Sequence, residues 1–331
     1  MKTVLEKLFS HHTLSYTEAK NVLLQIGRGD LNTCQTTSFL TVFQMRSITV
    51  NELSGFRDAL LELCLPVDLS EYDPIDLCGT GGDGKDTFNI STLASFVVAG
   101  AGISVAKHGN YSVSSSCGSS DVVQHLGYRF SSSEEQLKKE LDYSGICFLH
   151  APLFHPAMKL VAPIRKELKV KTFFNMLGPM VNPSRPNKQI VGVFSLELAR
   201  LYQYLYQQTP KQYSIIHALD GYDEISLTSP FKHISNNGDR VLSPSEIGLE
   251  PVRPEELYGG NTVKDAADLF IKILNGKGTS AQNRVVLANA ATAISTATAL
   301  NFSDSYEQAQ KSLSDGAALR CLNKLIETSK K

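Results

Sequence analysis

The feature that most constrains the fold is a change in sequence pattern near Tyr72. Beyond it, short apolar or β-branched runs alternate with helical patterns that end at glycines. Such alternation is typical of an α/β fold in which a mainly parallel central sheet is flanked by helices. We expect strands at 75–78, 103–109, 146–152, 189–195 and 213–219, and a hairpin turn at 236–239. We expect helices at 91–102, 121–127, 131–145, 155–168, 196–208, 263–278, 284–300 and 304–326.

The first 70 residues carry helix signals and little that suggests a strand. Thr17 is the expected N-cap of a helix that stops at Gly27 or Gly29. Thr49, followed three residues later by Glu52, predicts the capping box of a second helix. A small helical region therefore precedes the α/β region.

The charge balance argues against broad electrostatic binding. The chain has 32 Lys plus Arg and 33 Asp plus Glu, a formal net charge of -1. Proteins that bind nucleic acid or anionic membranes usually carry a basic excess, so we expect neither as a partner. Two uncharged stretches, 87–106 and 285–303, approach the length of a membrane span. Their Ser, Thr, Asn and Gly content instead favours buried elements of a soluble domain.

The cysteines and the N-terminus bear on the compartment. The six cysteines are spread along the chain with no CxxC pair, and the first residues lack the apolar run of a signal peptide. We expect a reduced, cytoplasmic protein without a zinc site.

The strongest local signal is the glycine-rich segment 76-DLCGTGGDGKDTFNIST-92. It leads from a predicted strand to a helix that begins near Asn89. Glycines let backbone N–H groups converge on an anion, and the helix N-terminus adds its positive dipole end, so the segment suits a phosphate or diphosphate. It is neither a Walker loop nor a GxGxxG motif, and a tight turn capped at Ser91 is the alternative. Asp83 is unfavourable beside a phosphate unless it meets a sugar hydroxyl or a metal.

Two further polar segments follow other strands. The segment 107-KHGNYSVSSSCGSSD-121 predicts a second anion-binding loop at the same sheet edge, with a polar linker as the alternative. In 220-DGYDEISL-227, Asp223 and Glu224 offer the hard oxygen ligands that Mg²⁺ uses beside substrate phosphates. A solvated turn is the alternative for this pair.

Together these segments resemble the anthranilate phosphoribosyltransferase family. GTGGD, NIST at 89–92, KHGN, FLHAPLFHPAM, FFNMLGPMVNP and GYDEISL stand in that family's order and spacing, and the resemblance covers essentially the whole chain. It implies transfer of the 5-phosphoribosyl group of 5-phosphoribosyl 1-diphosphate (PRPP) to the amine of anthranilate, in tryptophan biosynthesis. The products would be diphosphate and N-(5-phosphoribosyl)anthranilate.

The resemblance also implies an architecture and a cofactor. A helical domain would span 1–70 with a returning segment near 156–178, and an α/β domain would span 71–155 and 179–331. Two magnesium ions per subunit are expected, together with a homodimer formed through the helical domain.

Site residues are implied by position in the family motifs. Those implied to contact PRPP are Gly79, Gly82, Asp83, Thr87, Asn89, Ile90, Ser91, Thr92, Lys107, His108, Gly109, Asn110, Ser114, Ser115 and Ser119. Those implied for anthranilate are Gly79, Asn110, Ala151, His155, Arg165 and Gly178, and those for magnesium are Ser91, Asp223 and Glu224. Arg165 can make a two-point contact with the anthranilate carboxylate, with a helix-surface arginine as the alternative. No general base is assigned; His108 and His155 are candidates, and structural roles are the alternative for both.

The second loop departs from the family pattern. Tyr111 stands where the family usually has arginine, and Ser116 and Cys117 replace a Lys-Ser pair. Two cationic side chains are therefore absent beside the phosphates. Each could contribute a charge-assisted hydrogen bond of about 1.5 to 3 kcal/mol, so the departure bears on donor affinity.

Two other functions compete with this one. A pyrimidine nucleoside phosphorylase would share the KHGN loop, but GTGGD and the Asp223-Glu224 pair argue against it, since a departing nucleobase has no need of magnesium. A non-catalytic relative that binds nucleic acid or another ligand would fit the missing cations, but nucleic-acid binding would need a basic surface.

Overall fold

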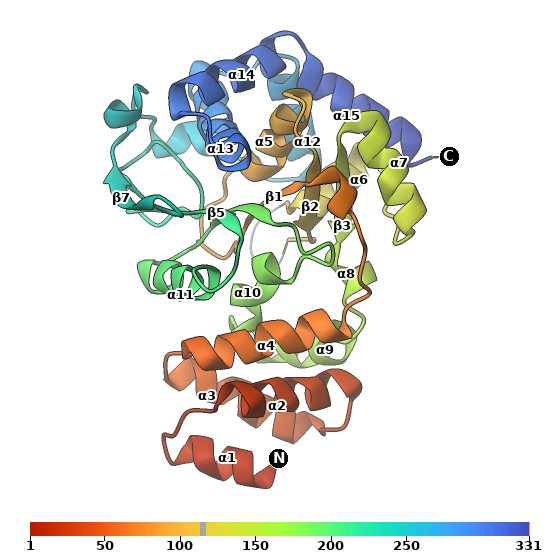
Figure 1. Cartoon of the computed structure of the whole chain (residues 1–331), viewed down its shortest axis with the longest axis vertical. Helices are drawn as coiled ribbons and strands as arrows, with labels where there is room; N and C mark the ends of the chain where they lie inside the picture. Colours follow the sequence, from red (N-terminus) through yellow and green to blue (C-terminus); the bar gives the residue numbers. More distant parts are fainter. Residues whose placement is uncertain (113–116, 331) are drawn as a thin grey trace. The chain divides into compact units, whose positions relative to one another are not determined.

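The computed structural model describes residues 1–112 and 117–330, so the predicted donor contacts Ser114 and Ser115, and Ser116, lie outside the described residues. The chain divides into two compact units (Figure 1). The helical unit comprises Met1–Val67 and Ala151–Arg185, and the α/β unit comprises Asp68–His150 and Pro186–Lys331. These limits differ from the expected ones at the returning segment, because a helix begins directly where the third strand ends at His150.

The helical unit is built mostly from short helices. They are α1 (Lys2–Phe9), α2 (Tyr16–Arg28), α3 (Thr33–Met45), α4 (Val50–Leu63), α8 (Ala151–Phe154), α9 (Met158–Leu168), α10 (Phe174–Leu177) and the 3-10 helix η2 (Gly178–Val181). The expected cap of α2 at Thr17 is wrong. Ser15 caps it, because its hydroxyl accepts the N–H of Glu18 while the Glu18 carboxylate accepts the N–H of Ser15. The expected stop at Gly29 is confirmed by its left-handed φ of 82°.

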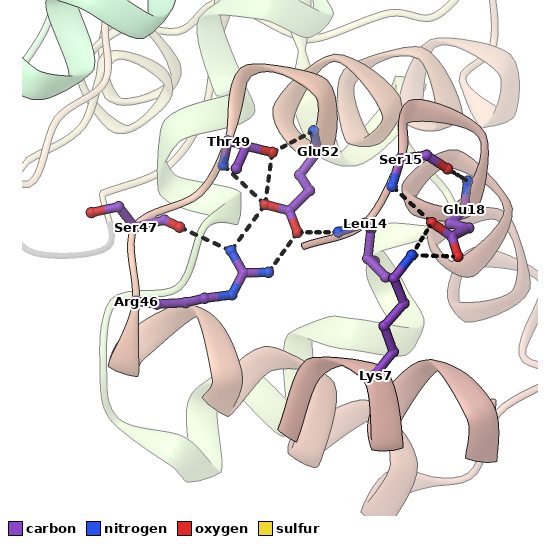
Figure 2. Close-up of polar contacts among 8 residues, drawn as sticks. All are labelled: Lys7, Leu14, Ser15, Glu18, Arg46, Ser47, Thr49 and Glu52. Atoms are coloured by element: carbon purple, nitrogen blue, oxygen red, sulfur yellow. Dashed lines mark hydrogen bonds and ion pairs between the residues drawn. The ribbon is translucent and has the colours of Figure 1, made fainter. Parts of the chain in front are cut away.

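Glu52 fixes the loops of the helical unit (Figure 2). The predicted box with Thr49 is confirmed: the carboxylate accepts the Thr49 N–H at 2.9 Å. It also accepts the Leu14 N–H at 2.9 Å and two guanidinium contacts from Arg46 at 3.0 and 2.5 Å. Burial alone would raise the pKa of Glu52, but Arg46 and these N–H donors outweigh it and lower the pKa. One buried carboxylate thus ties the loops before α2 and before α4 together.

Aromatic packing holds the returning segment in the helical unit. Phe173 stacks on Phe56 of α4 with ring centroids 4.4 Å apart, and it meets Phe39 and Phe43 of α3 edge to face. Such pairs stabilise beyond the area they bury. The segment therefore belongs to the first core although it lies about a hundred residues later in the sequence.

The α/β unit contains one seven-stranded sheet in the order β3-β2-β1-β4-β5-β6-β7. The pairs from β3 to β5 are parallel, and β6 and β7 join antiparallel. This confirms the predicted α/β class. The strands are β1 (Ile75–Gly79), β2 (Val105–Gly109), β3 (Ile146–His150), β4 (Lys188–Gly192), β5 (Gln212–Ala218), β6 (Phe231–Ser235) and β7 (Gly238–Leu242). The predicted hairpin turn is confirmed between β6 and β7.

Helices cover both faces of the sheet. They are α5 (Ile90–Gly100), α6 (Ser119–His125), α7 (Glu134–Ser144), α11 (Leu196–Tyr206), α12 (Val263–Leu274), α13 (Ser280–Thr298), α14 (Phe302–Ser314) and α15 (Ala317–Thr328), with 3-10 turns η1 (Ser70–Tyr72), η3 (Pro244–Ile247) and η4 (Pro254–Leu257). Figure 1 shows α5 and α13 above the strands and α11 below them. The single helix expected over 304–326 is wrong, because Gly316 adopts a φ of 68° and separates α14 from α15.

The strand order places a topological switch point beside β1. The chain moves from β1 to β2 and β3 on one side, then returns to β4 on the other side of β1. Ligands of open α/β sheets bind at the carboxyl ends of the strands at such a point. Across residues 1–112 and 117–330, no single helix is long and apolar enough to span a bilayer, whereas α13 and α14, bent by 118°, pass that test as a pair.

Candidate active site

The segment that carries Asp223 packs directly on the carboxyl ends of two central strands. Gly79 ends β1 and pairs in register with Gly192, which ends β4. A Cβ on Gly79 would lie 2.4 Å from Asp223 Oδ2, and a Cβ on Gly192 would lie 1.4 Å from the Asp223 carbonyl oxygen. Both strands therefore need glycine at this point to admit the carboxylate segment.

Two backbone N–H groups bind the two carboxylates. Gly81, at a φ of 62°, donates its N–H to Asp223 Oδ2 at 2.7 Å. Ser91, in the first turn of α5, donates its N–H to Glu224 Oε1 at 3.2 Å. The glycine-rich loop and the start of α5 thus present N–H groups inward, as the sequence pattern predicts for an anion site.

Three carboxylates, those of Asp83, Asp223 and Glu224, lie near one another in this part of the site. Burial raises the pKa of Asp223, and the neighbouring Asp83 carboxylate raises it further. Burial also raises the pKa of Glu224, as does Asp223, while Lys107 lowers it. Since a nearby cation would favour the ionised forms, the pair is suited to bind one.

The donor set fits magnesium when a substrate supplies further ligands. Within the described ranges, no group of three or more His, Cys, Asp or Glu side chains is assembled as a metal site. The protein offers two carboxylates, and the Ser91 residue beside them; all three line a small cavity of about 10 Å³. Mg²⁺ is commonly held by one or two carboxylates together with substrate phosphates. A site in which the protein supplies only part of the coordination shell is therefore typical of this ion.

The second strand places two predicted donor residues inside the sheet. Lys107 on β2 is 1% exposed, and its ammonium donates to the Leu77 carbonyl of β1. Burial lowers the pKa of Lys107, opposed by the Asp76 and Glu224 carboxylates. The backbone N–H of His108 donates to Asp76 Oδ1 at 3.1 Å. Lys107 is therefore a buried cation within the sheet, and it lowers the pKa of the nearby Glu224 carboxylate.

The second loop is closed by Asp121 of α6. One oxygen of this carboxylate accepts the N–H groups of Ser112 and Gly118, each at 2.8 Å. The loop also meets the first one, because Asn89 Nδ2 donates to the Cys117 carbonyl at 3.1 Å. Ser119 Oγ donates to the Asn110 carbonyl at 3.3 Å. The polar-linker alternative does not fit a loop with this many internal contacts.

The structure groups the predicted residues by unit. The first loop carries Gly79, Gly82, Asp83, Thr87, Asn89, Ile90, Ser91 and Thr92, and the second carries Lys107, His108, Gly109, Asn110 and Ser119. The metal candidates Asp223 and Glu224 join them in the α/β unit, whereas Ala151, His155, Arg165 and Gly178 lie in the helical unit.

The acceptor candidates have defined neighbours within the helical unit. His155 is buried, and its Nε2 lies 2.9 Å from the Val181 carbonyl, so Nε2 carries the hydrogen and donates it. Arg165 donates to Asn175 Oδ1 at 3.2 Å, and its guanidinium lies 5.5 Å from the centre of the Phe174 ring. Arg165 is therefore half-buried and oriented, unlike the surface arginine considered as its alternative.

Sequence reasoning missed a pair of residues beside the site. Lys85 Nζ lies 4.5 Å from the centre of the Tyr222 ring, immediately before Asp223. Both residues line a cavity of about 490 Å³ together with Gly84, Asp86, Thr87, Pro254, Glu255, Leu257 and Tyr258. The only signal in the sequence was a lysine inside a glycine-rich loop, and this signal does not predict which residue the lysine contacts.

Comparison with known proteins identifies both units. Residues 71–319 match the α/β domain of a glycosyl transferase family, and residues 2–64 match the helical bundle domain described for a glycosyl transferase family. The anthranilate phosphoribosyltransferase of Flavobacterium psychrophilum is 60% identical over 99% of this chain and 100% of its own length. That of Bacteroides thetaiotaomicron is 49% identical over the full length of both.

Solved structures agree with these sequence matches. Anthranilate phosphoribosyltransferase from Thermus thermophilus is similar with a TM-score of 0.90 at 30% identity, over 99% of both chains. The Saccharomyces cerevisiae enzyme in complex with PRPP and Mg has a TM-score of 0.90 at 29% identity, over 98% of this chain and 96% of that one. The same yeast enzyme with 4-fluoroanthranilate has a TM-score of 0.88 at 28% identity and the same coverage.

Proposed function

The chain belongs to the anthranilate phosphoribosyltransferase family, and we propose how its own residues carry out that family's reaction. The protein transfers the 5-phosphoribosyl group of PRPP to the amine of anthranilate, a step of tryptophan biosynthesis. The observation that carries the assignment of its residues is the convergence of the Gly81 and Ser91 N–H groups on Asp223 and Glu224.

The glycine-rich loop and the carboxylate pair would hold the donor's diphosphate. A yeast relative binds PRPP with Mg, and the carboxylates of the buried Asp223 and the partly buried Glu224 are the hard ligands that such an ion takes. Magnesium, when bound, neutralises the diphosphate as it departs. We propose two ions, one for each carboxylate, with Ser91 as a further oxygen ligand.

The remaining donor contacts would come from the two loops. The first loop and the start of α5 would supply backbone N–H groups to the phosphates, and Asp83 would face a sugar hydroxyl or a metal ion. The second loop would contribute His108, Gly109, Asn110 and Ser119, together with Ser114 and Ser115. Lys107 would act on the donor through charge from within the sheet, supported by its contact with the Leu77 carbonyl.

The helical unit would bind anthranilate. The Arg165 guanidinium, oriented by Asn175 and the Phe174 ring, would pair with the acceptor carboxylate in a two-point contact. His155 donates from Nε2 to the Val181 carbonyl, which gives this ring a structural contact in the helical unit. Ala151 and Gly178 would line the acceptor site, and a Cβ on Gly178 would meet nothing within 4 Å. Gly79 and Asn110 are the further acceptor contacts that the family motifs imply.

Positioning and charge stabilisation would carry the chemistry. As the amine attacks the anomeric carbon, the sugar gains positive, oxocarbenium-like character and the diphosphate gains negative charge. Oriented N–H groups in a buried site stabilise that separation without having to reorganise. Such a mechanism needs no strong general base, in keeping with the structural contacts of His155.

Two further properties are part of the proposal. Exposed apolar side chains on the helical unit, Phe9 at 59% and Met45 at 81%, support a homodimer formed through that unit. The six cysteines are all free, which supports a reducing, cytoplasmic location.

Anthranilate fluorescence provides the direct test. Purified protein with PRPP and magnesium is expected to consume anthranilate, and omission of either PRPP or magnesium is expected to stop the loss of signal. Absence of turnover at saturating PRPP, accompanied by phosphorolysis of thymidine or uridine, would instead establish a nucleoside phosphorylase.

A further inference from the structure

We propose that Lys85 is a donor-binding residue, whose ammonium group pairs with the diphosphate of PRPP and supplies positive charge that the second loop lacks between Asn110 and Asp121. This inference rests on the proposed function and deepens it. It places the Lys85 side chain, in the cavity beside the glycine-rich loop, at the border of the proposed diphosphate site.

The second loop cannot provide that charge through Tyr111. The Tyr111 hydroxyl donates to Gln124 Oε1 at 3.1 Å, and its ring lies edge-on to His150 at 4.6 Å between centroids. The side chain is thus anchored to α6 and β3 by uncharged contacts. With Ser116 and Cys117 beside it, the loop has no lysine or arginine between Asn110 and Asp121.

Lys85 is held in the glycine-rich loop, against the segment that leads into Asp223. Its backbone N–H donates to Asp83 Oδ1 at 3.0 Å, which fixes the lysine at its place in the glycine-rich loop. Its ammonium lies 4.5 Å from the centre of the Tyr222 ring, and Tyr222 is buried immediately before Asp223. The ammonium therefore lies beside the segment that carries both proposed metal ligands.

The backbone near Tyr222 accommodates this lysine. Gly221 has a φ of 102°, and a Cβ built there would lie 3.8 Å from Lys85 Cε. The lysine stem consequently lies against the glycine turn that leads into Asp223. Contact between the loop and this turn is part of how the fold brings the first loop to the carboxylates.

The ammonium is available for an anion. In the part of the chain that the structure describes, no carboxylate oxygen lies within ion-pair distance of Lys85 Nζ. Attraction to an aromatic face is weaker at an accessible site than a charge-assisted bond to phosphate. Because lysine is a point charge on a flexible four-carbon stem, it can exchange the ring for a phosphate oxygen.

The cavity that Lys85 lines borders the proposed donor site. Its volume is about 490 Å³, and of the described residues that line it only Lys85 is cationic. Thr87, a predicted donor contact, and Tyr222, next to a proposed metal ligand, both border it. Asp86 and Glu255 also line the cavity and would repel an anion there, so the phosphate would meet the Lys85 ammonium at the border of the cavity, next to Tyr222.

Steady-state kinetics with three variants test the proposal. Lys85→Met is expected to raise the KM for PRPP by about tenfold, the factor that corresponds to roughly 1.4 kcal/mol. The KM for anthranilate is expected to stay within about twofold, and inhibition by the product diphosphate to weaken as much as donor binding. Lys85→Arg, which keeps the charge, should restore most of the donor affinity. Lys311→Met, on the exposed face of α14, is the matched control and should behave as wild type.

Each outcome has a defined meaning. An unchanged KM for PRPP in Lys85→Met overturns the inference, and so does an equal rise in both KM values accompanied by a lower melting temperature, which would make Lys85 a structural residue. If the wild-type protein consumes no anthranilate at all, the proposed function fails instead. Added salt should raise the PRPP KM of wild type more than that of Lys85→Met, since screening weakens only the charge that is present.

Discussion

The Asp223 carboxylate accepts the backbone N–H of Gly81 at 2.7 Å, although the two residues stand 142 positions apart in the sequence. Glu224 engages the N–H of Ser91 in the same way. The N–H groups that suit a phosphate therefore have carboxylate acceptors already. A cation that binds those carboxylates would weaken their hold on the N–H groups, which couples metal binding to donor binding.

Magnesium and PRPP should therefore bind with positive cooperativity. Removal of magnesium with a chelator is expected to weaken PRPP binding by about tenfold or more, a coupling of the usual size between two sites. Calorimetric titration of PRPP with and without the ion measures the effect. By reciprocity, PRPP should tighten magnesium binding by the same factor, and independent binding of the two would contradict the scheme.

Replacement of the carboxylate pair should separate activity from stability. Asp223→Asn with Glu224→Gln is expected to lower kcat/KM by about a hundredfold or more, because the metal loses its ligands. Burial raises the pKa of both groups above their unfolded values, so their ionised forms destabilise the metal-free fold at pH 7. The metal-free double variant should melt at the same temperature as wild type or higher. A variant that keeps full activity would refute the assignment of both ligands.

Glycine at the end of β4 should be indispensable for the fold around the carboxylates. A Cβ at Gly192 would lie 1.4 Å from the Asp223 carbonyl oxygen, so Gly192→Ala forces the carboxylate segment to move and should cost about 3 kcal/mol or more. At Gly81 nothing lies within 4 Å of a built Cβ, and Gly81→Ala should cost only about 1 kcal/mol for its left-handed φ. Urea unfolding of the two variants checks this order, and a milder effect at Gly192 would be the contrary result.

The orientation of Arg165 predicts a selective effect on the acceptor. Arg165→Lys keeps the charge but loses the planar fork, so the KM for anthranilate is expected to rise by about tenfold while the KM for PRPP changes little. Asn175→Ala removes the group that accepts from Arg165 and should give a smaller rise in the same direction. Equal effects on both substrates would assign Arg165 a structural role instead.

Parts of this site could be predicted because parallel strands impose a common edge. The alternation of strands and helices predicted that the glycine-rich loop after β1 and the polar loop after β2 would meet, and Asn89 contacts Cys117 as a result. The strand order itself could not be read from the sequence. It is the return of the chain to β4, beside β1, that brings Asp223 onto Gly79 and Gly192.

Local signals failed where two patterns competed. Thr17 and Ser15 are both good caps, and only the position of Glu18 three residues after Ser15 decides between them. A continuous helical pattern concealed the break at Gly316, where the backbone turns left-handed. The approach of Lys85 to Tyr222 has no local signal at all, since it joins segments that only the folded sheet brings together.

A buried carboxylate that is not among the proposed site residues should control the pH dependence of stability. Glu140 of α7 is fully buried and accepts hydrogen bonds from Tyr128 Oη at 2.8 Å and from Gln136 Nε2 at 3.3 Å. Burial raises the pKa of Glu140 from 4.5 to about 7, and those two hydrogen bonds only partly oppose it. Between these two values the folded protein holds a proton that the unfolded chain has lost, so unfolding releases it and stability falls as pH rises.

The size and the control for this effect follow from the same two values. The gap between 4.5 and about 7 corresponds to roughly 3 kcal/mol, lost progressively as pH rises through that range. Glu140→Gln keeps the shape without the titration, so its unfolding free energy should decline less from pH 5 to 7 than that of wild type. Glu135→Gln makes the same change on the exposed face of α7, where the carboxylate pairs with Lys139 at 2.8 Å, and should leave the slope as it is. Urea unfolding at several pH values measures all three proteins, and parallel slopes for wild type and Glu140→Gln would show that Glu140 is ionised in the folded state.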